Sequence, residues 1–436
     1  MRRRTVGFAI LLIVTAVLGS SGSATAATGT VNWPQFRFNQ NHTGVNPSET
    51  TINASNITFV TLDWAAQLGM LVDFSSPAVV NGVAYIGSDD GRLWAYPADG
   101  CGQSLCTTPL WSSVSLAQII DSPAVKNGVV YVGSQTSPTS AAGRLNAFSA
   151  SGCGQAVCSP LWQGLAGTKS ILQSSPTLGS GLVFVAAFDG RLYAFNAKGC
   201  GAPTCLPVWK GSTGGSIESS PTVVGGVAYV GSDDGKLYAF NAAGCGAPSC
   251  PPLWTGSIGG SAFESSPAVA NGVVYIGSDH FLAAFDASGC GAAACAPLWQ
   301  GTYQGEFFGG SPAVAGGRVY IGLEDGLGVF AAGGCGQAVC GPLWLDFGSG
   351  AQAQVQSSPT VANGLVYAGR NTGQVLAWKT KPCGGFICSN IWSGDTGDPL
   401  VNSSPTVVNG KIYIGSADAN FPEDIQGRLY VFDSSL

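Results

Sequence analysis

One pattern recurs eight times along the 436-residue chain, and it leaves few folds open. Each copy reads Ser-Pro, a Gly-containing turn, an apolar strand ending in Gly, a polar turn, and a segment of the form Leu-x-Ala-Phe. The copies begin at Ser76, Ser122, Ser175, Ser220, Ser266, Ser311, Ser358 and Ser404. A period of 45 to 53 residues is typical of units that bury their apolar faces only by stacking on neighbours.

Each copy predicts four short strands. In the fourth copy, Ser220-Pro221 opens the first strand, Gly225-Gly226 turns it into the second, and Asp234-Gly235 turns the second into the third. These turn residues adopt the tight conformations that hairpins need. The fourth strand opens at a Trp after a loop that carries two Cys residues. Four-stranded units at this spacing predict the blades of an all-β propeller, whereas the alternative, a two-sheet sandwich, does not need eight near-identical units.

The Trp residues predict how the ring closes. Seven copies carry a Trp at the start of the fourth strand: Trp111, Trp162, Trp209, Trp254, Trp299, Trp344 and Trp392. The eighth copy ends at Leu436 without this strand, whereas residues 61–65, which include Trp64, resemble such a strand without a copy of its own. We therefore predict an eight-bladed β-propeller over residues 59–436, in which the N-terminal strand completes the last blade and leaves no unpaired edge. We expect all eight Trp side chains to pack between blades.

The N-terminal residues predict secretion. Arg2, Arg3 and Arg4 precede an apolar run over residues 6–18 that is too short to span a membrane, and Ala24-Thr25-Ala26 provides the small residues of a cleavage site. We assign residues 1–26 to a signal peptide and residues 27–58 to a lead-in segment, and we expect an extracellular protein with no lipid anchor and no C-terminal anchor. Loss of the leader changes the net charge from −6 to −9, which argues against a nucleic-acid partner.

All 14 Cys residues lie in seven loops of the form Cys-Gly-x-x-x-Cys. An even count at constant spacing in a secreted chain predicts disulfides, and pairing within each loop is the simplest solution. The predicted pairs are Cys101–Cys106, Cys153–Cys158, Cys200–Cys205, Cys245–Cys250, Cys290–Cys295, Cys335–Cys340 and Cys383–Cys388. The alternative is zinc, but each ion needs about four ligands, and His42 and His280 are the only His residues.

The repeat, together with Trp33-Pro34-Gln35-Phe36-Arg37 and His42-Thr43-Gly44 ahead of it, resembles the pyrroloquinoline-quinone-like (PQQ-like) propeller repeat. That resemblance implies two functional classes: dehydrogenases of alcohols or sugars that bind PQQ and Ca²⁺, and non-catalytic propellers that bind proteins, such as the outer-membrane assembly scaffold. The dehydrogenases commonly carry two adjacent Cys residues, and this chain has neither that pair nor a Cys-x-x-Cys-His haem motif. We therefore expect a non-catalytic scaffold for a protein or cell-surface glycan, with a PQQ- and Ca²⁺-dependent dehydrogenase as the alternative.

The first strand of a propeller blade is the innermost, so the residues just before each Ser-Pro are expected to rim the channel. Two positions before each Ser, the chain has Phe74, Ile120, Gln173, Glu218, Glu264, Gly309, Gln356 and Asn402, and Asp121 lies one position before. We predict a polar ring formed by Asp121, Gln173, Glu218, Glu264, Gln356 and Asn402. Its carboxylates suit Ca²⁺, with Glu218 and Glu264 as candidate ligands, or a polar ligand; a solvated channel mouth is the alternative.

The longest departures from the repeat predict where a partner binds. They are residues 135–143 in the second copy and residues 417–427 in the eighth. Both occupy the turn between the second and third strands, on the same face as the polar ring. Variable loops on a rigid scaffold commonly carry recognition. No nucleophile, base and acid could be combined into a catalytic set with only two His residues.

Overall fold

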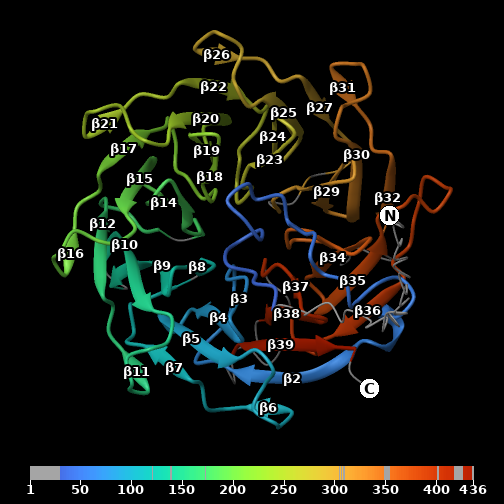
Figure 1. Ribbon diagram of the computed structural model, residues 1–436. Coiled ribbons are helices and arrows are strands. Elements are labelled where there is room, and N and C mark those ends of the chain that lie inside the picture. The colour runs from blue at the N-terminus through green and yellow to red at the C-terminus, as the bar shows by residue number, and fades with distance from the viewer. Residues whose placement is uncertain are drawn as a thin grey trace, which may run out of the picture. The chain divides into compact units, whose positions relative to one another are not determined.

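Eight sheets surround a central axis, so the prediction of an all-β, eight-bladed propeller is confirmed (Figure 1). The computed structural model describes residues 30–119, 121–137, 140–171, 173–303, 305, 307, 310–347, 354–399, 402–416 and 426–434. The innermost strands β3, β8, β13, β18, β23, β28, β33 and β37 contact one another in that cyclic order, with β37 returning to β3. The predicted signal peptide lies outside the described residues.

Four main strands form each blade, in order from the axis outward. Blades 1 to 4 comprise β3 (Ala78–Val80), β4 (Val83–Ser88), β5 (Arg92–Pro97) and β7 (Trp111–Ser113); β8 (Ala124–Lys126), β9 (Val129–Ser137), β10 (Ser140–Ser149) and β12 (Trp162–Ala166); β13 (Thr177–Gly179), β14 (Leu182–Ala187), β15 (Arg191–Asn196) and β17 (Trp209–Ser212); and β18 (Thr222–Val224), β19 (Val227–Ser232), β20 (Lys236–Asn241) and β22 (Trp254–Ser257). Blades 5 to 8 comprise β23 (Ala268–Ala270), β24 (Val273–Gly277), β25 (Leu282–Asp286) and β27 (Trp299–Gly301); β28 (Ala313–Ala315), β29 (Arg318–Leu323), β30 (Gly326–Ala331) and β32 (Trp344–Phe347); β33 (Thr360–Ala362), β34 (Leu365–Arg370), β35 (Gln374–Lys379) and β36 (Trp392–Asp395); and β37 (Thr406–Val408), β38 (Lys411–Ser416), β39 (Arg428–Asp433) and β2 (Thr61–Gln67).

The N-terminal strand closes the ring as predicted. Strand β2 pairs antiparallel with β39, with Thr61 opposite Asp433 and Gln67 opposite Arg428. The two segments are more than 360 residues apart in sequence and lie side by side in Figure 1. Blade 8 therefore combines three strands from the C-terminal end of the chain with an outermost strand, β2, from its N-terminal part.

The seven predicted disulfides are confirmed, with Cα atoms between 5.6 and 5.8 Å apart. The Cys loops also join blades, which the sequence did not reveal. Six of them form a two-residue strand that pairs in parallel with the outermost strand of the preceding blade: β6 (Leu105–Cys106), β11 (Val157–Cys158), β16 (Thr204–Cys205), β21 (Ser249–Cys250), β26 (Ala294–Cys295) and β31 (Val339–Cys340). The seventh makes a bridge between Ile387 and Leu345.

The eight Trp residues pack between blades. Trp209, for example, is 2% exposed and contacts the second and third strands of blade 4. The next Cys loop approaches it through Gly244, which has a φ of +83°, and a Cβ there would lie 2.7 Å from the indole ring. Glycine meets both requirements because it tolerates positive φ and carries no side chain. The Gly before six of the seven loops therefore belongs to the interblade packing, whereas Pro382 precedes the seventh loop.

The Ser-Pro positions form a closed ring of hydrogen bonds. The backbone N–H of each Ser donates to the Oγ of the equivalent Ser in the next blade, at 2.8 to 3.0 Å, and Ser404 returns to Ser76. The ring explains why Ser recurs at all eight starts, because the N–H groups are buried and need acceptors.

Candidate functional site

The lead-in segment runs through the central channel, where it follows the inner strands from blade to blade (Figure 1). Trp33 bridges Val79 in blade 1, and the carbonyl oxygen of Pro34 accepts from the N–H of Val125 in blade 2. Carbonyl groups of Gln40, Asn41, Thr43 and Gly44 accept from the equivalent residues of blades 4 to 7, Val223, Val269, Val314 and Val361. Strand β1 (Val45–Asn46) then pairs with β33. The segment therefore occupies the channel that the ring would otherwise leave open.

Two buried polar side chains hold the lead-in in place. The His42 ring lies between the hydroxyl groups of Thr177 and Thr222, 2.9 Å from each. Because the Thr222 hydroxyl donates to the carbonyl of Pro267, it accepts from His42 Nδ1–H, and Nε2 accepts from Thr177. Burial, followed by the charge of Arg37, lowers the pKa of His42 to about 3, so the ring is neutral at physiological pH.

Arg37 is 2% exposed and donates to the carbonyl groups of Pro312 and Pro359, in blades 6 and 7. Burial lowers its pKa to about 9. Both acceptors are backbone carbonyls, so the guanidinium fixes the lead-in against these blades by hydrogen bonds rather than by an ion pair.

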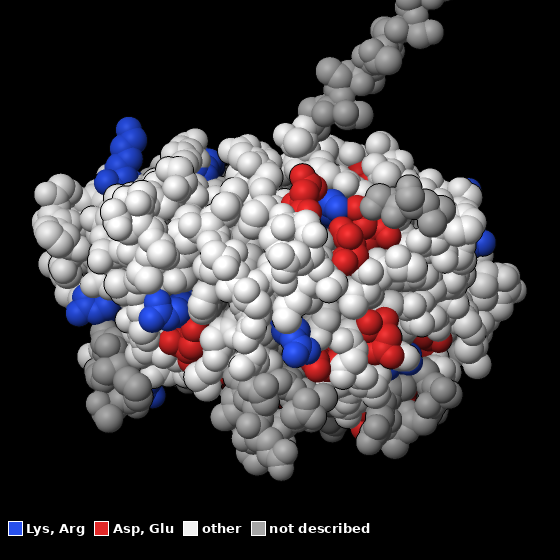
Figure 2. All heavy atoms as spheres, turned by 90° about the horizontal axis from the view of Figure 1, so that it is seen from below, with Lys and Arg blue, Asp and Glu red and all other residues white. Residues whose placement is uncertain are grey.

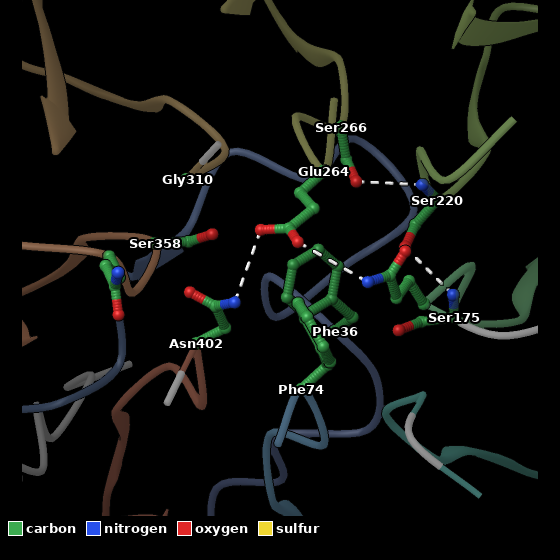
Figure 3. Close-up of a pocket in the computed structure, with 11 residues that line it drawn as sticks. Phe36, Phe74, Ser175, Ser220, Glu264, Ser266, Gly310, Ser358 and Asn402 are labelled. Atoms are coloured by element: carbon green, nitrogen blue, oxygen red, sulfur yellow. Dashed lines mark hydrogen bonds between the residues drawn. The ribbon is translucent and has the colours of Figure 1, made fainter. Parts of the chain in front are cut away.

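Above the lead-in lies a small cavity, on the face where the turns between second and third strands meet the connections between blades; we call it the rim face. The two kinds of loop are joined by backbone hydrogen bonds, such as Asp233 N–H to the Ser216 carbonyl. Phe36 of the lead-in and Phe74 line the cavity together with Gln173, Glu264, Gln356 and Asn402 (Figure 3). Four predicted rim residues are thus brought together, over a floor contributed by the lead-in.

Glu264 bridges the cavity. Its carboxylate accepts from the Gln173 amide at 3.4 Å and from the Asn402 amide at 3.3 Å, and so joins blades 3, 5 and 8 (Figure 3). Gln173, Glu264 and Asn402 have φ values of +71°, +58° and +54°, respectively. Left-handed backbone costs energy outside glycine and tends to occur where a site is pre-organised, which supports a role for this cluster.

The carboxyl groups around the cavity resist ionisation. Burial, followed by the charges of Glu218 and Asp73, raises the pKa of Glu264 to about 8. Burial and the charge of Asp233 raise the pKa of Glu218 to about 7. Asp73 and Asp89 are hydrogen-bonded to each other, and burial together with Asp73 raises the pKa of Asp89 to about 8. At neutral pH Glu264, Glu218 and Asp89 are therefore partly protonated rather than fully ionised.

The other predicted rim positions do not line the cavity. Asp121 is buried, and its carboxylate accepts from the Gly133 N–H at 2.6 Å, as the Ser75 hydroxyl accepts from Gly87 in blade 1. Asp121 therefore replaces a structural Ser and is left out of the proposed site. Glu218 is 8% exposed beside Glu264, and its Oε2 has no partner among the described residues. Ile120 and Gly309 lie outside the described residues.

The cavity does not fit PQQ. Its volume is about 30 Å³, which is room for one or two water molecules, whereas sites for drug-sized ligands measure roughly 300–1,000 Å³. Phe36 and the backbone of the lead-in occupy the space below. Among the described residues, no group of three or more His, Cys, Asp and Glu side chains lies close enough to bind a metal ion.

Charged side chains are few and mixed in sign on the side of the propeller seen in Figure 2. The fold defines a closed eight-bladed propeller. The PQQ_2 family model, described as "Outer membrane protein assembly factor BamB", matches residues 108–246 and 207–435, and the chain belongs to this family.

Solved structures confirm the fold. The structure of BamB from Moraxella catarrhalis aligns at a TM-score of 0.60 and 16% identity, over 86% of this chain and 99% of that one. The quinohemoprotein alcohol dehydrogenase from Comamonas testosteroni aligns at a TM-score of 0.67 and 13% identity, over 92% and 80%. The computationally designed protein Ika8 aligns at 0.59 and 14%, over 84% and 98%. A search of curated protein sequences found no significant match.

The compartment follows from the covalent structure. Seven disulfides indicate an oxidising compartment, extracellular or periplasmic. Within the described part of the chain, no helix has the length and apolar character needed to cross a membrane.

Proposed function

We propose that this chain is a secreted, non-catalytic binding propeller that engages a protein or a cell-surface glycan through its rim face. The observation that carries the proposal is the lead-in, which fills the channel and leaves a cavity of about 30 Å³ where a cofactor would lie. The family model describes an assembly factor, which supports a protein partner. We propose that residues 1–26 form a cleaved signal peptide, that residues 27–58 form the channel-filling lead-in, and that residues 59–436 form the propeller.

The second blade supplies the proposed partner surface. Its second and third strands, β9 and β10, contain 9 and 10 residues, against 6 in the equivalent strands β4 and β5 of blade 1. The pairing continues through Gly143 opposite Gln135 to Ser140 opposite Ser137, so this hairpin extends past the usual turn. In the second long segment, residues 417–427, residues 417–425 lie outside the described residues.

The rim cluster is proposed as the polar part of the same surface. The cluster consists of Glu264, Glu218, Gln173, Gln356 and Asn402, and its hydrogen-bonding groups are only partly paired within the described part of the chain. A partner that inserts a cationic or hydrogen-bond-donating group would favour the ionised carboxylates. A PQQ- and Ca²⁺-dependent dehydrogenase is the competing function, and the acidic groups at the rim are the observation that favours it.

A turn exchange tests the partner surface. Replacing residues 135–142 by Asp-Asp gives blade 2 the sequence Gly-Ser-Asp-Asp-Gly-Arg-Leu, which is the turn of blade 1 at residues 87–93, so the variant is expected to fold. Partners captured from the cell-surface fraction by the wild type would be identified, purified and titrated against both proteins. Loss of affinity in the variant, with an unchanged thermal melt, is the predicted result. Equal affinity would rule out the blade 2 hairpin, and the absence of any saturable partner would contradict the proposed function.

A further inference from the structure

The first position of the second strand is aliphatic in six blades and cationic in two. The six are Val83, Val129, Leu182, Val227, Val273 and Leu365, and the two are Arg318 in blade 6 and Lys411 in blade 8. Lys411 is neutralised, because its ammonium group contacts the carboxylates of Asp433, directly across the strand pair, and Asp63. Arg318 faces Ala331 across the equivalent pair.

Arg318 has no carboxylate within ion-pair distance among the described residues. Its Nη1 donates to the carbonyl of Gly316 at 3.4 Å, and it interacts with the hydroxyl of Tyr320, which itself donates to the carbonyl of Thr380. Its Nε is buried and has no acceptor in the part of the chain described. The partners of the guanidinium are neutral, so its charge is unbalanced and at least one donor is unused.

The guanidinium lines a cleft of about 230 Å³ between blades 6 and 7, on the face opposite the rim. Val45 and Pro47 of the lead-in form one wall, and Val361 and Ala362 of β33 form another. The site therefore combines apolar walls with one uncompensated cation. This volume is smaller than that of most sites for drug-sized ligands and suits a group about the size of one amino-acid residue or one sugar.

We propose that this blade 6–7 cleft binds an organic carboxylate, with Arg318 pairing with the carboxylate and the lead-in and β33 contacting the body of the ligand. A guanidinium presents two parallel N–H donors that match the two oxygens of a carboxylate, and partial burial strengthens such a pair. The carboxylate supplies the charge that Arg318 lacks among the described residues. The ligand is either the C-terminal residue of a peptide or a free organic acid. The inference concerns a different face and different residues from the proposed rim-face function, so the two can fail separately.

Titration calorimetry at low ionic strength, with the full mature chain, tests the inference. The probes are N-acetyl-alanyl-leucine, the same dipeptide as its C-terminal amide, and glucuronate. We expect the amide to bind about tenfold or more weakly than the free acid, because one charge-assisted interaction is lost. Arg318→Val introduces the aliphatic residue type of six other blades, so it should fold, and it should lose the same factor. Lys126→Ala removes an exposed cation of blade 2 and should leave binding unchanged.

Binding of the dipeptide acid alone would identify a peptide chain end, and binding of glucuronate as well would identify a general site for organic carboxylates. Three results would each overturn the inference: equal binding of acid and amide, unchanged binding by a folded Arg318→Val variant, or no binding of either acid at millimolar concentration.

Discussion

Replacement of Glu264 by Gln should stabilise the propeller at alkaline pH and change its stability little at acid pH. The pKa of Glu264 is raised to about 8 in the folded chain, from an ordinary value of 4.5, because the carboxyl is buried and faces Glu218 and Asp73. Between these two values the folded chain retains a proton that the unfolded chain releases, so the free energy of unfolding falls as the pH rises. The effect is absent below the ordinary pKa and complete above the raised pKa.

The magnitude follows from the interval between the two pKa values. One pH unit corresponds to about 1.4 kcal/mol, so an interval of about 3.5 units sets an upper limit near 5 kcal/mol. Because Glu264 is not fully buried and shares its surroundings with Glu218, we expect about 2–3 kcal/mol at alkaline pH, since water screens part of the interaction. Gln keeps the shape of the side chain and avoids this cost.

The measurement is a set of thermal melts of wild type and Glu264→Gln from about pH 5 to about pH 9. The melting temperature of the variant should rise relative to wild type as the pH increases. Glu324→Gln is the control, because Glu324 is exposed in the turn between β29 and β30, and its difference from wild type should stay small. The reasoning is refuted if the difference for Glu264→Gln is independent of pH, or if the variant is less stable than wild type at pH 9.

Three further changes test the packing. Trp254→Ala should lower the free energy of unfolding by about 3–5 kcal/mol, because the ring is buried between blades and only 5% exposed. A loss under about 1 kcal/mol in urea denaturation would show that this Trp does not stabilise the contact between blades. The double variant Cys245→Ser and Cys250→Ser should lower the free energy of unfolding by about 2 kcal/mol, because the unfolded chain regains loop entropy. Unchanged stability would show that the disulfide does not restrict the unfolded chain. His42→Ala should cost about 2–4 kcal/mol, since two buried hydroxyls lose a partner, and an unaltered thermal melt would argue against a lead-in held in the channel.

The fold was predictable because its determinants are periodic and local. The Ser-Pro starts and the Trp residues of the fourth strand are enough to count the blades, and Trp64, without a copy of its own, identifies the strand that closes the ring. The disulfide pairs were predictable for the same reason, since both Cys residues of each pair lie in one short loop.

The path of the lead-in was not predictable, because its contacts join residues that are far apart in sequence. The peptide from Trp33 to Asn46 contacts inner strands as distant as β37, where the Asn46 amide donates to the carbonyl of Val407. Its Trp-Pro-Gln-Phe-Arg sequence indicated the family but did not show that the segment lies in the channel. The hydrogen bond that Asp121 accepts from Gly133 was not predictable either, because only the structure shows that Asp121 takes the place that Ser75 has in blade 1.

PQQ binding tests most directly whether the lead-in closes the channel. The oxidised mature protein would be melted with and without PQQ and Ca²⁺, alongside dye-linked oxidation of a panel of alcohols and sugars. A ligand that binds only the folded state at about 100 times its dissociation constant adds about 2.7 kcal/mol. A channel filled by its own lead-in predicts no shift in melting temperature and no oxidation. A raised melting temperature together with substrate turnover would show that the quinone enters the channel, and would contradict a binding propeller.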